Sequence, residues 1–538
     1  MRMKIFLILI ILLGFILRFW QLGANPISID WDEASLGYNA YSLLKTAKDE
    51  YGTFLPTSFR SFGDYKPPLY TYLSVIPVYV FGLNEFSIRF ISALLGSFTI
   101  IVSYYLLKEL FPDKSAIFYL LCILFLAVSP WHIQFSRVAF EANIALFFLI
   151  CAILFFLKGL KKGRYFSISS VFFALSLYSY HSPRLIIPLL IPGLVLIYRK
   201  EIRNKIGLYL LSVLILFLLA FPIIKEFSSS VSARFGSVSV VNPNERLGAS
   251  IQAMELDQKR GDFLGKLMHN RRIVYGREVL AGYLDHFNFD FLFLTGDAPG
   301  RHHAASMGML YFWDLPFILL GVFYLLLKID KSVKVLFLWF LIAPIASAFT
   351  TGTPHAVRAL FYLPTYQIFT AFGVIKLVEL LKLRFAKKSA IVVLLFVFFL
   401  FILNFFYYLH MYYIHTPIEY ASWWQYGYKQ VVEEVNKLEA SRSKVIVTYH
   451  YDQPYIYFLF YKKIDPSWYQ QNWGHGEIMR SERKFGKYEF RNLDWKEDEK
   501  LTDVILVGTP DEIPENASGI VKNIHFPDGT VAFRIVAR

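Results

Sequence analysis

Adjacent carboxylates at Asp32 and Glu33, followed by Lys66, are the residues of this chain best suited to chemistry. The acids come directly after an apolar N-terminal segment, and Lys66 precedes two prolines that open a second apolar run. A carboxylate pair beside a membrane helix is costly, which favours a functional role. A carboxylate can accept a hydroxyl proton and a lysine can hold a phosphate. The structural alternative is that Asp32 caps a helix beginning at Ala34.

The composition indicates a membrane protein. Of 538 residues, 56% are hydrophobic, including 53 Phe and 35 Tyr, which is more than a soluble domain of this size carries. Cys122 and Cys151 both lie in apolar runs, so no disulfide framework is expected. The net charge of +14 could indicate nucleic-acid binding. The basic residues instead occupy short loops between apolar segments, so the expected partner is the lipid bilayer and not nucleic acid.

Eleven apolar segments are predicted to span the membrane, although several are shorter than the roughly 20 residues that a bilayer requires. They cover residues 1–20, 87–107, 115–128, 143–157, 165–180, 185–198, 206–224, 309–327, 335–349, 359–381 and 390–409. The first has a basic start but no small-x-small cleavage site after it. We therefore interpret it as an uncleaved helix and not as a signal peptide.

The placement of residues 67–82 follows from the charges of the turns. If this apolar run lies in the outer interface, the turns on one side of the membrane are rich in Lys and Arg and those on the other side are not. The turns rich in Lys and Arg are 108–114, 158–164, 199–205, 328–334 and 382–388, and those with one Arg each are 129–141, 179–184 and 351–358. The positive-inside rule predicts this asymmetry. We expect a plasma-membrane protein with a cytoplasmic N-terminus, eleven spans and an extracytoplasmic C-terminus.

The expected architecture is a transmembrane domain at 1–414 and a small extracytoplasmic α/β domain at 415–538. The transmembrane domain includes a first outer loop at 29–86 and a long outer loop at 225–306. The long loop contains a candidate amphipathic helix, and the C-terminal domain contains a predicted helix, two strands and a turn. These are residues 263–287, residues 428–438, the segments KVIVTYHY and DVILVG, and Pro527-Asp528-Gly529.

The same topology gathers polar side chains at the outer helix ends. Four arginines remain there, although outer turns are normally depleted of arginine. They are Arg137, Arg184, Arg301 and Arg358, and they are accompanied by Glu141, His181, His302, His303 and His355. Snorkelling from a helix end explains any single arginine. Together they are better explained as a pocket for an anionic headgroup, since arginine pairs well with phosphate.

These motifs resemble those of the polyprenyl-phosphate-dependent GT-C glycosyltransferases. The specific matches are Asp32-Glu33 in DEA…Y and Lys66-Pro67-Pro68 in KPPLYTYL, and SRVAFE at 136–141 is a weaker one. The most similar branches are the bacterial relatives of protein O-mannosyltransferases and of lipid A aminoarabinose transferases. The resemblance covers the membrane part from Ile29 to about Leu381.

The resemblance implies a fold of eleven to thirteen membrane helices with interfacial helices in the first outer loop. It implies that Asp32 is the catalytic base, that Glu33 supports it and that Glu141 is a second acid of the site. Lys66 would hold the lipid phosphate, with Tyr65 beside it among the substrate-binding residues. Where relatives carry Asp, this chain has Glu141, whose extra methylene changes its reach.

The expected activity is the inverting transfer of one sugar from undecaprenyl or dolichyl phosphate to an acceptor at the outer face. Asp32 would take the acceptor proton, a role typically worth about 10²–10⁴-fold. Lys66, with one or more of Arg137, Arg184 and Arg358, would neutralise the leaving phosphate. No tight metal-ligand spacing is visible, so no metal site is assigned. No cofactor is obligatory, and a divalent cation, Mg²⁺ or Mn²⁺, is an optional addition.

Three alternatives stay open. A transporter or lipid flippase would place ionisable groups near the bilayer midplane, whereas the predicted spans are almost free of charge except for Asp314. A structural scaffold would leave the Asp32-Glu33 pair unexplained. The sequence WWQYG at 423–427 resembles the WWDYG signature of oligosaccharyltransferases, but Gln425 stands in place of the acid, which argues against en bloc transfer.

Overall fold

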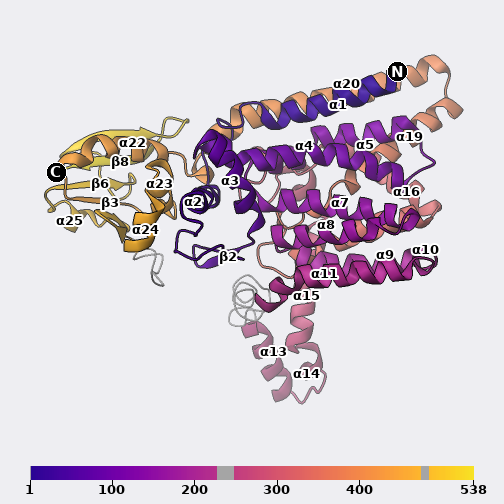
Figure 1. Ribbon diagram of the computed structural model, residues 1–538, viewed down its shortest axis with the longest axis horizontal. Helices are drawn as coiled ribbons and strands as arrows, with labels where there is room; N and C mark the ends of the chain where they lie inside the picture. Colours follow the sequence, from indigo (N-terminus) through magenta and orange to yellow (C-terminus); the bar gives the residue numbers. More distant parts are fainter. Residues whose placement is uncertain (1, 227–246, 474–483) are drawn as a thin grey trace.

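The computed structural model describes residues 2–226, 247–473 and 484–538. Long helices lie side by side in one bundle, and a sheet domain built from the C-terminal residues stands at one end of it (Figure 1). The predicted long outer loop includes residues 227–246, which lie outside the described residues.

Each of the eleven predicted apolar segments contains a helix of the bundle. These helices are α1 (Arg2–Phe19), α4 (Glu85–Leu110), α5 (Ala116–Val128), α7 (Glu141–Lys161), α8 (Tyr165–Ser179), α9 (Pro183–Ile197), α11 (Ile206–Glu226), α16 (Asp314–Leu327), α17 (Lys331–Ile342), α19 (Thr365–Arg384) and α20 (Lys387–His410). Within the described residues, five helical stretches are long and apolar enough to cross a membrane, or six if α5 and the bent continuation α6 (Pro130–Arg137) form one span. The chain is therefore a polytopic helical membrane protein, and the count of eleven spans stays a prediction.

Short helices connect the long ones. They are α10 (Arg199–Arg203), α13 (Leu247–Lys259), α14 (Gly265–Met268), α15 (Arg271–Asp285), η1 (Asp290–Leu294), α18 (Ile345–Ala348), η2 (Leu360–Tyr362), η3 (Met411–His415), α21 (Thr416–Glu419) and η4 (Ser422–Trp424). The helix predicted at 263–287 is broken in two, because Asn270 accepts a hydrogen bond from the Arg272 amide and caps α15 at that point.

The first outer loop consists of α2 (Trp31–Thr46), a hairpin of β1 (Phe59–Ser61) and β2 (Asp64–Lys66), and α3 (Leu69–Phe81). At 1.5 Å per residue, the 13 residues of α3 extend about 20 Å, which is short of the ~30 Å hydrocarbon core. Figure 1 shows α2 and α3 at the end of the bundle next to the sheet domain. This position agrees with the predicted interfacial helix.

The C-terminal domain is a six-stranded mixed sheet with helices. Its elements are α22 (Tyr428–Leu438), η5 (Glu439–Ser441), β3 (Lys444–Val447), α23 (Pro454–Tyr461), α24 (Pro466–Asn472), β4 (Lys484–Phe485), β5 (Tyr488–Phe490), α25 (Trp495–Asp498), β6 (Val504–Gly508), β7 (Ile520–His525) and β8 (Val531–Ala537). The strand order is β4-β5-β3-β6-β8-β7, with β3 parallel to both neighbours. The predicted helix and strands are confirmed, and the predicted turn joins β7 to β8.

The sheet domain packs directly on α2. The Tyr38 hydroxyl donates to the Ile464 carbonyl (3.1 Å), and the Gln470 amide donates to the Ser42 hydroxyl and the Asp49 carbonyl (2.9 and 2.8 Å). Gly37 lets the two surfaces meet, since a Cβ there would lie 2.7 Å from the Phe460 ring. The C-terminal domain therefore helps to hold the helix that carries Asp32.

The two ends of the bundle differ in what they carry. The N-terminus and α10 lie at the end away from the sheet domain, whereas α2 and α3 lie next to it (Figure 1). The alternating chain direction places the Lys/Arg-rich turns with the N-terminus. This arrangement is the one that the positive-inside rule requires if the sheet domain is extracytoplasmic.

Cysteines introduced at Ser58 and Ser518 should test this orientation. Both should react with an impermeant thiol reagent on intact cells, because the first loop and the sheet domain share one side. Cys122 and Cys151 are buried, so the unsubstituted protein serves as the background control. Labelling at one position only, or at neither until lysis, would contradict the eleven-span orientation.

Candidate active site

Asp32 and Lys66 form an ion pair at the centre of the first outer loop. The Lys66 Nζ lies 2.6 Å from the Asp32 Oδ1, and the Asp32 side chain is 38% exposed whereas that of Lys66 is 10% exposed. Burial alone would lower the pKa of Lys66, but Asp32 and Glu141 raise it above its usual value. The arrangement provides an accessible carboxylate beside a lysine that stays charged.

The helix cap is Asp30, not Asp32. The Asp30 carboxylate accepts a hydrogen bond from the Glu33 amide (2.8 Å), and α2 begins at Trp31. The structural alternative, in which Asp32 caps a helix beginning at Ala34, is therefore wrong. Asp32 lies in the first turn of α2, where the partial positive charge of the helix N-terminus favours an anion.

Asp30 also connects α2 to the loop that carries Arg301. The Arg301 Nη1 lies 3.4 Å from the Asp30 Oδ2, and its guanidinium stands 4.6 Å from the Trp31 ring centre. Burial raises the pKa of Asp30 to about 7, and the nearby Arg301 opposes that rise. Arg301 therefore contacts the two residues that directly precede Asp32 in the chain.

Glu33 is held by a buried arginine that the sequence interpretation did not include. Arg89 donates from Nε and Nη2 to the two Glu33 carboxylate oxygens, both at 2.9 Å, and both side chains are buried. The Ala139 amide donates to the same carboxylate (3.0 Å). Arg89 also donates to the Pro26 carbonyl (2.9 Å). Glu33 therefore ties α2 to α4 and to the segment before α7.

Glu141 and His181 also lie close to Lys66. Glu141 is the first residue of α7 and is one of the charges that act on Lys66. The His181 Nε2 lies 3.2 Å from the carbonyl oxygen of Tyr65, whose side chain is half-exposed on β2. The structure therefore brings four of the predicted site residues around Lys66: Asp32, Tyr65, Glu141 and His181.

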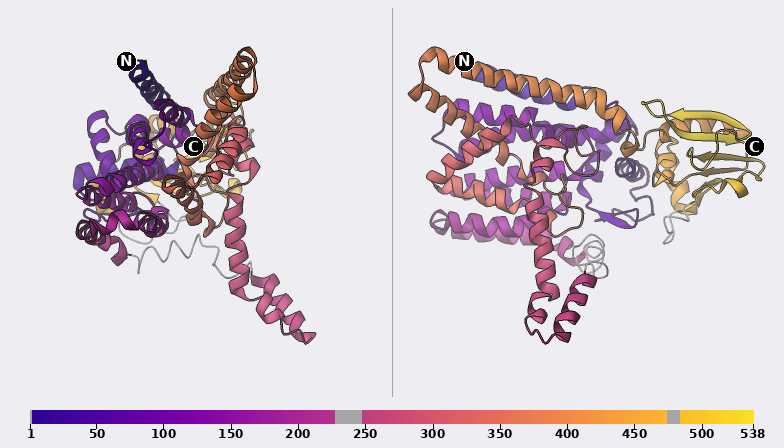
Figure 2. Two further views of the ribbon diagram at one scale, coloured as in Figure 1. Left: turned by 90° about the vertical axis from the view of Figure 1, so that its right-hand side faces the viewer. Right: turned by 180° about the vertical axis from the view of Figure 1, so that it is seen from behind.

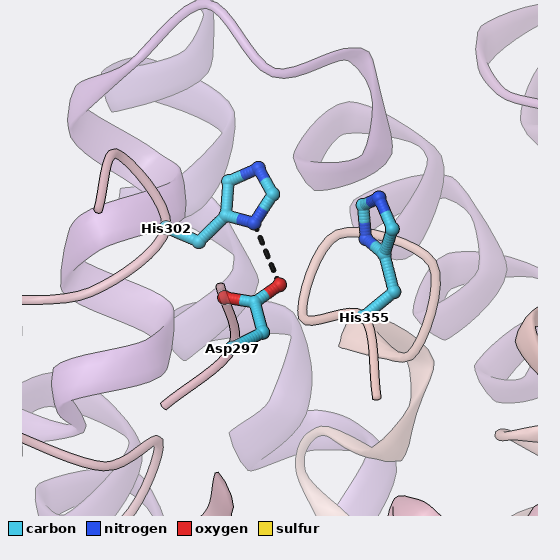
Figure 3. A group of neighbouring side chains, drawn as sticks. All are labelled: Asp297, His302 and His355. Atoms are coloured by element: carbon cyan, nitrogen blue, oxygen red, sulfur yellow. Dashed lines mark hydrogen bonds and ion pairs between the residues drawn. The ribbon is translucent and has the colours of Figure 1, made fainter. Parts of the chain in front are cut away.

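A second cluster lies behind Arg301. The His302 Nδ1 and the Asp297 Oδ2 are 2.7 Å apart, and the Ala356 amide donates to the same carboxylate oxygen (2.8 Å). Figure 3 shows His355 reaching from a separate loop toward this pair. Burial lowers the pKa of both histidines, while His302 holds the pKa of Asp297 below its usual value although burial opposes this.

This cluster has the residue types and spacing of a metal site. One ligand atom from each of Asp297, His302 and His355 lies within 4.8 Å of the others. The Asp297 Oδ1 and the His355 Nδ1 are buried without a hydrogen-bond partner. Two imidazoles and one carboxylate suit a transition metal such as Zn²⁺, whereas Mg²⁺ and Mn²⁺ prefer oxygen ligands. The residues present therefore fit a divalent cation.

Arg137 points into the protein. It is fully buried, and it donates to the Leu17 and Asn25 carbonyls (2.8 and 2.9 Å) and to the Tyr412 hydroxyl (3.1 Å). These contacts connect α1, the segment before α2, and η3. They are typical of a residue that positions the outer loop, and its predicted role in phosphate binding stays a prediction.

Arg184 and Arg358 make contacts within their own turns. The Arg184 Nε donates to the Leu177 carbonyl (3.4 Å), and the Arg358 Nη1 donates to the Thr350 hydroxyl and the Thr351 carbonyl (2.6 and 3.0 Å). His303 lies with its Nε2 2.8 Å from the Asp297 carbonyl. The predicted roles of Arg184, Arg358 and His303 in substrate binding are untested.

Three functional side chains were missed from the sequence: Asp30, Arg89 and Asp297. Each of them carried a signal in the sequence. Arg89 is a charged residue inside a predicted span, and such residues are rare and need a partner. Asp297 precedes the Arg301-His302-His303 run by only a few residues. Asp30 carried the same helix-capping signal that was assigned to Asp32.

The side chains of the WWQYG segment contact other residues of the protein. Trp424 is buried, and the Arg89 guanidinium lies over its ring, 6.0 Å from the ring centre. The Gln425 side chain accepts a hydrogen bond from the Tyr457 hydroxyl (3.2 Å) and donates to the Trp423 carbonyl (3.0 Å). The position that carries an acid in the resembling signature is therefore part of the domain's own hydrogen bonding here.

Comparison with known proteins supports the resemblance drawn from the motifs. Residues 65–224 match the family described as dolichyl-phosphate-mannose-protein mannosyltransferase. No curated protein sequence matches the chain.

Solved structures share the fold at low sequence identity. ArnT from Cupriavidus metallidurans bound to undecaprenyl phosphate is similar with a TM-score of 0.52 and 11% identity over 99% of this chain and 97% of that one. The archaeal oligosaccharyltransferase AglB from Archaeoglobus fulgidus, in complex with an inhibitory peptide and a dolichol-phosphate, is similar with a TM-score of 0.50 and 13% identity over 90% of this chain. The match covers only 61% of the AglB chain. The chain therefore has the GT-C fold, and within it residues 65–224 match the dolichyl-phosphate-mannose-protein mannosyltransferase family.

Proposed function

We propose that this protein transfers a single sugar from a polyprenyl phosphate to an acceptor at the outer membrane face. The observation that supports the proposal most directly is the 2.6 Å contact between Asp32, partly exposed, and Lys66, buried. A carboxylate open to an incoming hydroxyl and a lysine able to hold a phosphate are the two groups that the reaction needs. The similar ArnT and AglB structures contain undecaprenyl phosphate and dolichol-phosphate, respectively.

The reaction replaces one C–O bond at the anomeric carbon with another and moves one proton from the acceptor to the enzyme. The acceptor oxygen attacks the anomeric carbon while its proton passes to the Asp32 carboxylate. The bond between that carbon and the phosphate oxygen breaks, and its electron pair leaves with the polyprenyl phosphate. Lys66 turns from Asp32 to the leaving phosphate and offsets its growing charge. A single displacement of this kind inverts the anomeric centre.

Arg301 is the arginine that we assign to the phosphate side of the site. It is anchored through Asp30 and Trp31, the residues immediately before Asp32. Its Nη1 atom faces Asp30, and its Nε atom is buried without a hydrogen-bond partner, so the Nε donor remains for a ligand. A divalent cation held by Asp297, His302 and His355 would add positive charge beside Arg301. Lys66 and Arg301 also bring positive charge to this side of the site, so we propose that the cation adds to the reaction and is not obligatory.

En bloc oligosaccharide transfer is the less favoured alternative. Gln425 takes the place of the acid in the resembling signature, and both ends of its amide are hydrogen-bonded within the protein. A flippase is also less favoured, because the ion pairs described above gather at one end of the bundle and not at its middle.

The test is a panel of labelled polyprenyl-phosphate sugars presented to the purified protein in proteoliposomes. We expect one donor to lose its sugar, with release of free polyprenyl phosphate, when envelope material supplies the acceptor. Assays with chelator and with added Zn²⁺ or Mg²⁺ measure the contribution of a cation. Movement of an intact lipid-linked sugar between leaflets, without release, would overturn the proposal in favour of a flippase.

Lys66→Ala should weaken donor use more than Lys66→Arg. Alanine removes the cation and leaves Asp32 without its 2.6 Å partner, whereas arginine keeps a positive charge at that position. The measurement is the donor KM of each variant beside its melting temperature. Lys45, exposed on the last turn of α2, gives a matched Lys45→Ala control. An unchanged donor KM in Lys66→Ala would show that Lys66 does not bind the phosphate.

A further inference from the structure

A helical hairpin at residues 247–285 stands apart from the rest of the protein. It consists of α13, α14 and α15, and Figure 1 shows it projecting from the half of the bundle nearer the sheet domain, across the direction of the long helices. The two views of Figure 2 show the same projection. Within the described residues, α13 contains no buried residue and α15 buries only Gly282. Within the part of the chain that the structure describes, little therefore covers the surface of the hairpin.

Large apolar side chains cover that surface. On α15, Ile273, Leu280 and Leu284 are exposed at spacings of seven and four residues, which places them on one face of the helix. At the tip, Phe263 is 81% exposed and Leu267 is 59% exposed. Such a concentration of exposed apolar side chains marks a contact with lipid or protein, since water is an unfavourable neighbour for it.

The tip is also strongly basic. Residues 259–272 contain five basic residues and a single acid, Asp262. Lys259, Arg260, Arg271 and Arg272 are exposed around the apolar tip. Exposed apolar side chains beside lysine and arginine are typical of helices that lie in the interface of an anionic membrane.

We propose that the hairpin lies along the outer surface of the membrane, with its apolar side chains among the lipids and its basic tip at anionic headgroups. The spans run along the membrane normal, so an element that crosses their direction in the half nearer the sheet domain runs parallel to the bilayer, on the side of the bundle that we expect to be outer. Because the tip is basic, we propose anionic lipid as its binding partner. The inference rests on the polytopic fold and not on the proposed transfer reaction.

An environment-sensitive fluorophore on Phe263→Cys tests the proposal in the full-length protein. The protein is placed in nanodiscs of phosphatidylcholine, with or without phosphatidylglycerol, at one copy per disc. We expect spin-labelled lipid to remove most of the fluorescence at position 263 and aqueous iodide to remove little. Asn516→Cys, exposed on the C-terminal domain, is the matched control and should show the opposite pattern. The native cysteines are buried, so the unsubstituted protein gives the background.

The charge is tested by changing Lys259, Arg260, Arg271 and Arg272 to Gln together. We expect phosphatidylglycerol to increase lipid quenching at position 263 in the protein with the basic tip, and this increase to disappear in the neutral variant. Iodide quenching at 263 equal to that at 516 would overturn the proposal. Protection from iodide without lipid quenching, seen only with two copies per disc, would overturn it in favour of a protein contact. A phosphatidylglycerol response retained by the neutral variant would overturn the assignment to anionic lipid.

Discussion

Asp32→Asn should reduce sugar transfer by on the order of 10²-fold or more, because it removes the proton acceptor. Asparagine keeps the size of the side chain, and the cap of α2 is untouched since Asp30 provides it. Folding and donor-lipid binding should therefore change little. The measurement is transfer by the purified protein with the donor that the panel identifies, with binding and melting temperature determined separately.

A matched control is Asp494→Asn, which changes the same atoms at the cap of α25, on the side of the sheet domain away from α2 (Figure 1). Asparagine and aspartate cap helices about equally well, so this variant should keep its activity. Glu141→Gln identifies the alternative base. Near-normal turnover in Asp32→Asn would reject Asp32 as the base and leave Glu141 as the next candidate.

Arg89→Met should destabilise the protein strongly. The substitution leaves the Glu33 carboxylate buried without its bidentate partner, and breaking a buried ion pair typically costs about 3–5 kcal/mol. Turnover should also fall, because Glu33 and Asp32 share the first turn of α2. The measurement is the melting temperature in detergent, with turnover at a temperature where the variant is folded.

Lys429→Met is the matched control for Arg89→Met. It breaks the ion pair between Lys429 and Glu85 at 2.8 Å, in which the lysine side chain is 47% exposed. The Glu85 side chain is 16% exposed, but water reaches the lysine end of the pair, so the melting temperature should fall much less than in Arg89→Met. Adding Glu33→Leu to Arg89→Met should recover part of the stability, because the unpaired charge is then gone. Equal melting temperatures for the two single variants would show that the buried pair does not hold α2.

The sequence by itself determined the class of the protein and singled out Asp32 and Lys66, which the structure brings together as an ion pair. In lipid the backbone must satisfy its own hydrogen bonds, so spans are helices and long apolar segments reveal them. The alternation of charged turns separated the short α3 from the spans. Asp32 and Lys66 could be predicted because short motifs around them carry the resemblance. The helix at 428–438 and two strands followed from local periodicity, which does not depend on distant contacts.

Partners distant in the sequence were decided only by the tertiary structure. Glu33 and Arg89 are 56 residues apart, and Asp297 meets Ala356 across 59. The residues next to each partner in the sequence do not predict either pairing. Each pairing forms because the packing of the helices brings distant segments together. The sequence also could not identify the helix cap, although the candidates are neighbours. Residues 30–33 contain three acids that could each cap a helix, and Asp30 is the cap because α2 begins at Trp31. The contact of the sheet domain with α2 likewise depends on surfaces that form only when both domains are folded.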